Sequence, residues 1–209
     1  MTTRPAIRGV ILDFGGVLWD MRWDVARELE EAHGLPRGAL AETLYRTPTW
    51  AGIERGRGDR AAWLEEAHRL LETRAGGPLP RLHEAWRHAQ GLIPQNVALV
   101  RALRGSYRIA LLSNADASLR SRLRDGLGIH GLFDVVIASA EEGIAKPDPA
   151  IYQLAAERLG LSAEACVFVD DAEVNVTAAT EVGMRGLHFR LDRGHDLAAL
   201  LGGLGVKPC

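Results

Sequence analysis

An aspartate at the end of an apolar run near the N-terminus is the residue of this chain best placed to do chemistry. Val10–Leu12 is followed by Asp13, and Gly15 and Gly16 come two and three residues later. Such a run predicts a buried parallel strand, and a charge at its end is costly unless it meets a metal, a cation or several N–H groups. The glycines allow the backbone to turn sharply beside a ligand. Asp13 is therefore a candidate nucleophile or metal ligand; the alternative is an aspartate that caps the next turn.

Three later segments, residues 109–114, 144–149 and 166–171, place polar side chains beside apolar runs. The first and third are expected to be buried strands, and the second has a lysine before a proline that can open a helix. Taken singly, each has a structural explanation as a loop hydroxyl, a solvated lysine or an acidic turn. The polar residues concerned are Ser113, Asn114, Lys146, Asp170 and Asp171.

In this order, the four segments resemble the motifs of the haloacid dehalogenase-like hydrolase superfamily, most of whose members are phosphatases. The resemblance extends from Val10 to about Phe189. Ligands of an open parallel sheet bind beyond the carboxyl ends of its strands, so Asp13, Ser113 and Asp170 are expected at one edge.

The resemblance implies a phosphoryl-transfer role for each matching residue. Asp13 is expected to attack phosphorus and form an aspartyl-phosphate. Ser113 and the backbone around Asn114 are expected to bind the phosphoryl oxygens, and Lys146 to neutralise charge and orient the nucleophile. The substrate implied is a small phosphorylated metabolite.

The resemblance also implies a magnesium site. Asp13, Asp170 and the main-chain carbonyl of Gly15 are expected to hold Mg²⁺, with Asp171 acting from outside the ligands. Asn175 completes an Asp-Asp-x-x-x-Asn pattern. This pattern resembles the branch that includes the phosphatase domain of soluble epoxide hydrolases, and it is expected to place Asn175 beside the acidic pair.

Gly15 departs from the family pattern. The family's phosphatases carry a second aspartate at this position, which protonates the leaving oxygen and then activates water. Such help is typically worth about 10²–10⁴-fold in rate. We therefore expect impaired or rerouted chemistry that favours good leaving groups. Other acidic residues near the motifs are interpreted as structural, Asp116 as the cap of the following helix. They are Asp20, Asp24, Asp116, Glu141 and Glu142.

Two other functions remain open. One is a catalytically weak or silent phosphate-binding module that uses its inserted segment to bind a partner or metabolite. The other is a carbon–halogen hydrolase with Asp13 as nucleophile. The dehalogenase branch needs no metal, so the pair Asp170 and Asp171 disfavours it.

The composition is typical of a globular enzyme domain. The chain has 209 residues, of which 47% are hydrophobic and 25% charged, and a formal net charge of −2. This balance argues against nucleic-acid binding, and Arg55, Arg57 and Arg60 are interpreted as a solvated loop. The sequence has no apolar stretch of membrane-spanning length, so we expect a cytoplasmic monomer or homodimer. Cys166 and Cys209 do not indicate a disulfide.

The alternation of elements predicts a doubly wound parallel sheet with an inserted helical cap. The core is expected over residues 1–17 and 93–209, and the cap over residues 18–92. Strands are predicted near 7–13, 108–112, 134–138, 166–170 and 185–189. Helices of the core are predicted near 95–104, 117–127, 148–159, 173–182 and 196–202.

Periodic apolar residues predict helices throughout the cap. Asp59 is expected to cap one of them. Trp19 and Trp23, near the entry to the cap, are candidate substrate contacts. The remaining interpretations are structural: packing for Trp50 and Trp63, a surface salt bridge for Arg22, and solvent or helix packing for His83 and His88.

Overall fold

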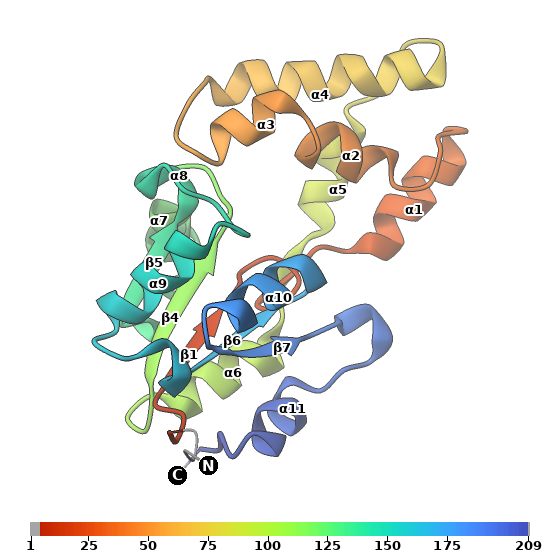
Figure 1. Ribbon diagram of the computed structural model, residues 1–209. Helices are drawn as coiled ribbons and strands as arrows, with labels where there is room; N and C mark the ends of the chain where they lie inside the picture. Colours follow the sequence, from red (N-terminus) through yellow and green to blue (C-terminus); the bar gives the residue numbers. More distant parts are fainter. Residues whose placement is uncertain (1–4, 209) are drawn as a thin grey trace.

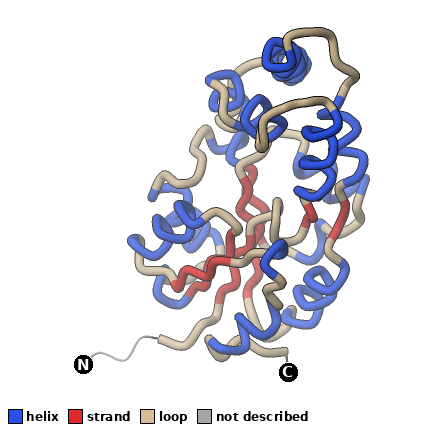
Figure 2. The backbone as a smooth tube through the Cα atoms, turned by 90° about the vertical axis from the view of Figure 1, so that its right-hand side faces the viewer, coloured by secondary structure: helices blue, strands red, loops and turns tan. Residues whose placement is uncertain are grey.

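Five parallel strands form the central sheet of the computed structural model, which describes residues 5–208 (Figures 1 and 2). Their order in the sheet is β5-β4-β1-β6-β7. The sheet therefore extends in both directions from β1, which places the switch in strand order between β1 and β6. All five strands lie where the sequence predicts them, and the doubly wound α/β fold is confirmed. Their bounds are β1 Gly9–Leu12, β4 Arg108–Ser113, β5 Val135–Ala138, β6 Cys166–Asp170 and β7 Arg185–His188.

Helices cover both faces of this sheet, because successive side chains of a strand point to opposite faces. In β1, Val10 and Leu12 join a cluster with α6, α7 and α11, whereas Ile11 joins a second cluster with α9 and α10. The three central strands β4, β1 and β6 are buried on both faces, as expected for parallel strands. The helices are α6 Pro94–Leu103, α7 Leu119–Ser121, α8 Ser139–Glu142, α9 Pro149–Arg158, α10 Glu173–Glu181 and α11 Leu197–Gly203.

The predicted helix near 117–127 differs in form. A short α7 is followed by a π-helical turn, Arg122–Gly126. Leu119 and Leu123 are buried against the sheet, and Gly128 beyond the turn has a positive φ of 65°. The wider turn presents Arg122 toward the edge of the sheet that carries the motifs.

Five helices stand above that edge of the sheet (Figure 1). They have a hydrophobic cluster of their own, centred on residues such as Leu44, Trp63 and Trp86. The Asp59 Oδ1 atom accepts a hydrogen bond from the Ala62 N–H at 2.7 Å, which confirms the predicted cap of α4. We call these five the inserted helices: α1 Trp23–Ala32, α2 Ala39–Tyr45, α3 Pro48–Ile53, α4 Arg60–Ala75 and α5 Leu82–Ala89.

Two short antiparallel strands connect the inserted helices to the sheet domain. β2 (Trp19–Asp20) pairs with β3 (Gly91–Leu92). The sequence does not predict them, because two residues are too few to show an alternating pattern. The predicted boundaries between core and cap, at residues 17/18 and 92/93, stay a prediction. Residues 1–4 of the predicted core and its last residue, Cys209, lie outside the described part of the chain.

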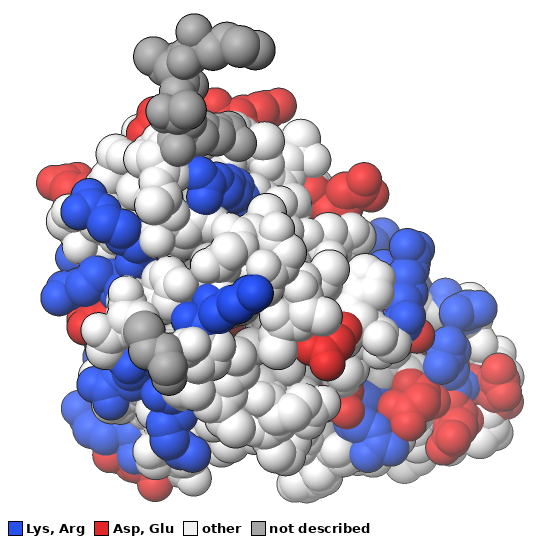
Figure 3. Space-filling view, turned by 90° about the horizontal axis from the view of Figure 1, so that it is seen from below, with Lys and Arg blue, Asp and Glu red and all other residues white. Residues whose placement is uncertain are grey.

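The surface on the underside of the molecule carries both signs of charge. Both basic and acidic side chains are exposed on this face (Figure 3). Over residues 5–208, no helix has the length and apolar character needed to cross a membrane.

Candidate active site

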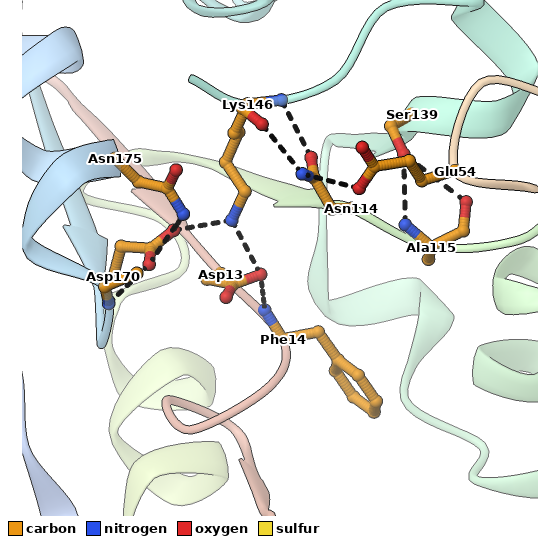
Figure 4. Close-up of polar contacts among 10 residues, drawn as sticks. Asp13, Phe14, Glu54, Asn114, Ala115, Ser139, Lys146, Asp170 and Asn175 are labelled. Carbon is orange, nitrogen blue, oxygen red and sulfur yellow. Dashed lines mark hydrogen bonds and ion pairs between the residues drawn. The ribbon is translucent and has the colours of Figure 1, made fainter. Parts of the chain in front are cut away.

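A lysine lies between two buried carboxylates at the carboxyl end of the sheet. Asp13 follows β1 and Asp170 ends β6, so neighbouring strands bring them together. The Lys146 Nζ atom lies 3.0 Å from Asp13 Oδ1 and 2.5 Å from Asp170 Oδ2 (Figure 4). The exposed fractions are 8% for Asp13, 4% for Lys146 and 0% for Asp170. The structure thus assembles three of the residues that the motifs identify.

Hydrogen bonds fix the orientation of these groups. Asp13 Oδ1 accepts a bond from the Phe14 N–H at 2.7 Å. The Asn114 side chain forms two hydrogen bonds with the backbone of Lys146. Its Nδ2 donates to the Lys146 carbonyl at 2.9 Å, and its Oδ1 accepts from the Lys146 N–H at 2.8 Å. Asn175 Nδ2 donates to both oxygens of Asp170 at 3.1 Å. Asn175 therefore lies beside the acidic pair, as expected.

This cluster holds three carboxylates, those of Asp13, Asp170 and Asp171, and one ammonium group, that of Lys146. Burial raises the pKa of Asp13 to about 7, with Lys146 opposing the shift and Asp170 and Asp171 reinforcing it. Burial also raises the pKa of Asp171 to about 6, reinforced by Asp170. Burial disfavours the charge on Lys146, yet the two carboxylates that it contacts raise its pKa above the usual value. The lysine is thus charged, and the site still has an excess of negative charge that a cation could relieve.

The same carboxylates offer a set of metal ligands. Oxygens of Asp13, Asp170 and Asp171 lie within 4.8 Å of one another, and a set of oxygen ligands alone suits a hard cation such as Mg²⁺. We expected Asp171 outside the ligands, but its oxygen belongs to this group. Its side chain also explains Gly16, whose φ is +73° and whose added Cβ would lie 2.3 Å from Asp171 Oδ2. Gly15 lines the adjoining cavity.

A cavity of about 380 Å³ lies above the cluster, bounded by the inserted helices. Asp13, Ser113, Asn114 and Lys146 form what we call the floor. Ser113 ends β4, beside β1, and is 6% exposed. The wall is mostly aromatic and cationic. Its aromatic residues include Trp19, Trp23, Tyr45, Trp50 and Trp63, and its arginines are Arg60, Arg87 and Arg122.

The structure places both tryptophans singled out as substrate contacts, Trp19 and Trp23, on this wall. Trp50 and Trp63, interpreted as packing residues, do pack together with ring centroids 4.8 Å apart. They line the cavity as well. Trp50 and Trp63 therefore do both: they pack against each other and they line the cavity.

The interpretation of the arginine-rich loop as solvated is incomplete. Arg60 is exposed, as expected, but it also lines the cavity, and its Nε atom lies 3.1 Å from Asp116 Oδ2 in the sheet domain. Arg57 is exposed, as expected of a solvated loop, whereas Arg55 is only half-buried and pairs with Glu54 at 2.7 Å. The expected surface salt bridge of Arg22 is present, with Asp24 at 2.9 Å.

The expected cap role of Asp116 also needs correction. The helix begins later, at Leu119, and Ser118 is its N-cap residue. Asp116 accepts a hydrogen bond from the Ser118 N–H at 2.8 Å instead, and it lines the cavity. Glu141 and Glu142 pair with Arg120 and Arg158, so they act structurally as interpreted.

Sequence reasoning missed Glu54. It follows α3, is 9% exposed and lines the cavity together with Asp13. Its Oε2 atom accepts a hydrogen bond from Asn114 Nδ2 at 3.1 Å (Figure 4). Burial raises its pKa, against the effects of Arg55 and Asn114. Nothing in the sequence marks it, because it lies about 40 residues from the first motif (54 against 13) in a loop rich in glycine and arginine.

Comparisons with known proteins identify the family. A family model described as haloacid dehalogenase-like hydrolase matches residues 7–183. The chain is 34% identical over 201 residues to a phosphatase of Mycobacterium tuberculosis, covering 90% of this chain and 88% of the relative. It is 30% identical over 188 residues to a sesquiterpene phosphatase of Aspergillus oryzae, covering 87% and 89%. It is also 30% identical over 212 residues to a phosphoglycolate phosphatase of Yersinia pestis, covering 95% and 88%.

A solved structure shows the same fold. A haloacid dehalogenase family enzyme of Bacteroides thetaiotaomicron, crystallised with magnesium and inorganic phosphate, superposes with a TM-score of 0.69 at 21% identity. The match covers 93% of this chain and 99% of that one. The chain belongs to the haloacid dehalogenase-like hydrolases, and it is an enzyme of their phosphatase branch. The predicted family and enzyme class are thereby confirmed.

Proposed function

We propose that this enzyme is a magnesium-dependent phosphatase that acts on a small phosphorylated metabolite through an aspartyl-phosphate at Asp13. The observation that carries the proposal is the buried cluster of Asp13, Lys146 and Asp170 on the floor of an open cavity. Burying a charge cluster of this kind costs free energy, and clusters of buried titratable groups concentrate at functional sites. The phosphatase names of the relatives support the same reaction class.

The contacts of Asp13 suggest how it reacts. Its Oδ1 atom is held by the Phe14 N–H and by Lys146. Oδ2 would then attack phosphorus, forming the aspartyl-phosphate as the bond from phosphorus to the leaving oxygen breaks. Ser113 and the backbone at Asn114 would bind the phosphoryl oxygens, and the Lys146 ammonium would neutralise their charge. Water would then hydrolyse the aspartyl-phosphate, releasing phosphate and restoring Asp13.

Magnesium fits the donor set that these residues provide. Asp13 and Asp170 would hold it with the main-chain carbonyl of Gly15, and Asp171 could contribute directly or from outside the ligands. When bound, the ion would supply positive charge to the phosphoryl group. Asn175 would keep Asp170 in place, since it donates to both of its oxygens.

Thermal unfolding can test the magnesium site without measuring activity. Magnesium should raise the Tm of the unmutated protein, and Asp170→Asn should remove most of this response. Asp125→Asn is a suitable control, because Asp125 is exposed, lies outside the cavity lining and pairs with its neighbour Arg124. Absence of a magnesium response in the unmutated protein would count against the phosphatase proposal.

Glu54 is our candidate for the missing general acid. At Gly15 the space of a side chain is bordered by Met21, whose Sδ atom would lie 3.5 Å from an added Cβ. Glu54 instead approaches the cavity from the inserted helices, and burial raises its pKa, a shift that favours the protonated form of a general acid. It would give its proton to the leaving oxygen and later accept one from the attacking water. Asp116 suits this role less, because although burial opposes ionisation, hydrogen bonds from Ser118 and Arg60 lower its pKa.

A screen of phosphorylated metabolites tests the function directly. It should include anomeric and acyl phosphates, be run with and without magnesium, and use Asp13→Asn to detect a contaminating phosphatase. We expect magnesium-dependent release of phosphate that the variant lacks. Binding of phosphate without turnover of any substrate would favour the silent binding module. Release of halide from a haloacid without magnesium would favour the dehalogenase.

The arrangement of the chain is proposed on the same basis. Residues 18–92 would act as a cap that excludes water and contacts the substrate, and residues 1–17 and 93–209 would form the catalytic core. A cytoplasmic location and a monomeric or homodimeric state stay predictions.

A further inference from the structure

Three arginines from separate elements meet at the wall of the cavity. Arg60 begins α4, Arg87 lies in α5 and Arg122 begins the π-helical turn. They are close enough to influence one another, because burial lowers the pKa of Arg122 and the charges of Arg87 and Arg60 lower it further. Asp116 and Tyr45 oppose this shift. Like charges that gather at a partly desolvated surface repel one another unless an anion lies between them.

The protein itself neutralises one of the three. Arg60 pairs with Asp116 at 3.1 Å. Within residues 5–208, no carboxylate forms an ion pair with Arg87 or Arg122. These two guanidinium groups are therefore free to take an anion that enters the cavity.

Aromatic rings hold Arg122 in place. Its guanidinium carbon lies 5.1 Å from the ring centroid of Phe14 and 5.8 Å from that of Trp19. The two rings are themselves stacked, with centroids 5.5 Å apart. Stacking leaves the edge of a planar guanidinium group open, and that edge carries the N–H donors that bind carboxylate or phosphate oxygens.

We propose that Arg87 and Arg122 form a second anion site of this cavity, separate from the phosphoryl site at Asp13 and Lys146. It would bind a carboxylate or a further phosphate group of the substrate. The aromatic wall beside it suits a flat or apolar substrate body. This inference rests on the proposed phosphatase function, and it narrows the substrate class to phosphate esters or anhydrides with a second anionic group.

A matched pair of substrates isolates that second group. 4-Carboxyphenyl phosphate and 4-carbamoylphenyl phosphate have similar shape and leaving groups but differ in one negative charge. The unmutated enzyme should favour the carboxylate by about 10- to 100-fold in kcat/KM, the effect expected of charge-assisted hydrogen bonds. 1,4-Phenylene bisphosphate provides the phosphate arm. Whichever of the two probes with a second anionic group is the better substrate identifies the oxyanion that the site prefers.

Two variants and a matched control locate the effect. Arg122→Gln and Arg87→Gln should each lower kcat/KM for the anionic probes and leave the carbamoyl probe almost unchanged. Arg124→Gln should change neither, since Arg124 lies in the same π-helical turn but is not among the residues that line the cavity, and it pairs with Asp125. Circular dichroism of each variant would establish that it is folded.

The outcomes separate this inference from the proposed function. Equal kcat/KM for the carboxyl and carbamoyl probes in the unmutated enzyme would overturn the second site and leave the phosphatase intact. Equal losses on both probes in Arg122→Gln and Arg87→Gln would overturn it too, because the arginines would then act on the transferred phosphoryl group. If neither probe is turned over, calorimetry can measure the affinity of each probe for the Asp13→Asn variant. Tighter binding of the carboxyl probe supports the site, and equal binding overturns it.

Discussion

The floor and the wall of the cavity are built in different ways. The floor comes from the ends of β1 and β4 and from Lys146. Asp13, Ser113 and Lys146 are buried, and hydrogen bonds hold Asp13, Asn114 and Lys146. Much of the wall comes from the inserted helices and the segments that flank them, and residues such as Trp23 and Arg87 are only partly buried. Rigid, pre-oriented groups suit bond breaking, whereas a partly exposed wall suits selection of the rest of the substrate. We therefore expect changes in the floor to abolish the reaction and changes in the wall to alter substrate preference.

One loop of the inserted helices joins the two regions. Glu54 bonds to Asn114 and Arg60 pairs with Asp116. Between them, Gly56 has a φ of +72° and passes so close to α8 that an added Cβ would lie 2.3 Å from the Ala140 carbonyl oxygen. The loop over residues 54–60 therefore brings residues of the wall into direct contact with the floor and with the sheet domain beside it.

The largest expected effect is in the floor. Asp13→Asn should lower turnover by at least about 10³-fold, because a covalent step cannot proceed without its nucleophile. Asp116→Asn is the matched change in a carboxylate that lines the same cavity without touching Lys146, and it should cost much less. Steady-state kinetics with an aryl phosphate would compare them. Comparable activity of Asp13→Asn and the unmutated enzyme would mean that Asp13 is not the nucleophile.

A smaller effect is expected at Glu54, where the wall supplies a group to the reaction. If Glu54 is the acid, Glu54→Gln should lower turnover of alkyl phosphates by about 10²-fold or more and of aryl phosphates far less, because a phenolate needs little protonation to leave. Glutamine keeps an acceptor for Asn114, so a purely structural role would predict little change. Little change on either substrate, or equal losses on alkyl and aryl substrates, would show that Glu54 does not transfer a proton.

The floor was predictable from the sequence and much of the wall was not. Asp13, Ser113 and Asp170 lie at the ends of buried apolar strands, and a run of a few residues is enough to predict both the strand and the polar group at its end. Glu54 and Arg122 lie in segments whose residues are typical of solvated surface. Only the docking of the 54–60 loop and the π-helical turn, which depend on packing between distant segments, bring them to the cavity.

Gly15→Asp tests whether the floor can regain its own acid. Gly15 has no positive φ, and an added Cβ would make an ordinary contact of 3.5 Å with Met21 Sδ, so the backbone permits the substitution. We expect Gly15→Asp to raise the turnover of alkyl phosphates by a smaller factor than Glu54→Gln lowers it, because Met21 occupies part of the space that the new carboxylate needs. The clearest measurement is the double variant, in which Gly15→Asp should restore part of the activity that Glu54→Gln removes. No gain in either background, even with Met21→Ala, would argue that the floor lacks more than an acid.

The smallest expected effect concerns the free energy of unfolding of the inserted helices, which carry part of the wall. His83 of α5 is buried, its Nε2 atom lies 2.9 Å from Thr43 Oγ1, and burial lowers its pKa from 6.5 to about 4. The unfolded chain therefore binds a proton more readily than the folded one, so stability from the neutral ring is complete above pH 6.5 and is lost as the pH falls toward 4. Between pH 7 and pH 4.5 the loss should be roughly 2–3 kcal/mol in the free energy of unfolding.

Tryptophan fluorescence can follow this loss, because all five tryptophans lie between residues 19 and 86. Urea unfolding at the two pH values should show a smaller pH dependence in His83→Gln than in the unmutated protein. His88→Gln should behave like the unmutated protein, since His88 is exposed on the same helix. If the fluorescence transition shifts with pH while far-UV circular dichroism keeps a second, unshifted transition, the inserted helices unfold apart from the sheet domain. A single transition by both probes would mean instead that the 54–60 loop couples wall and floor into one cooperative unit.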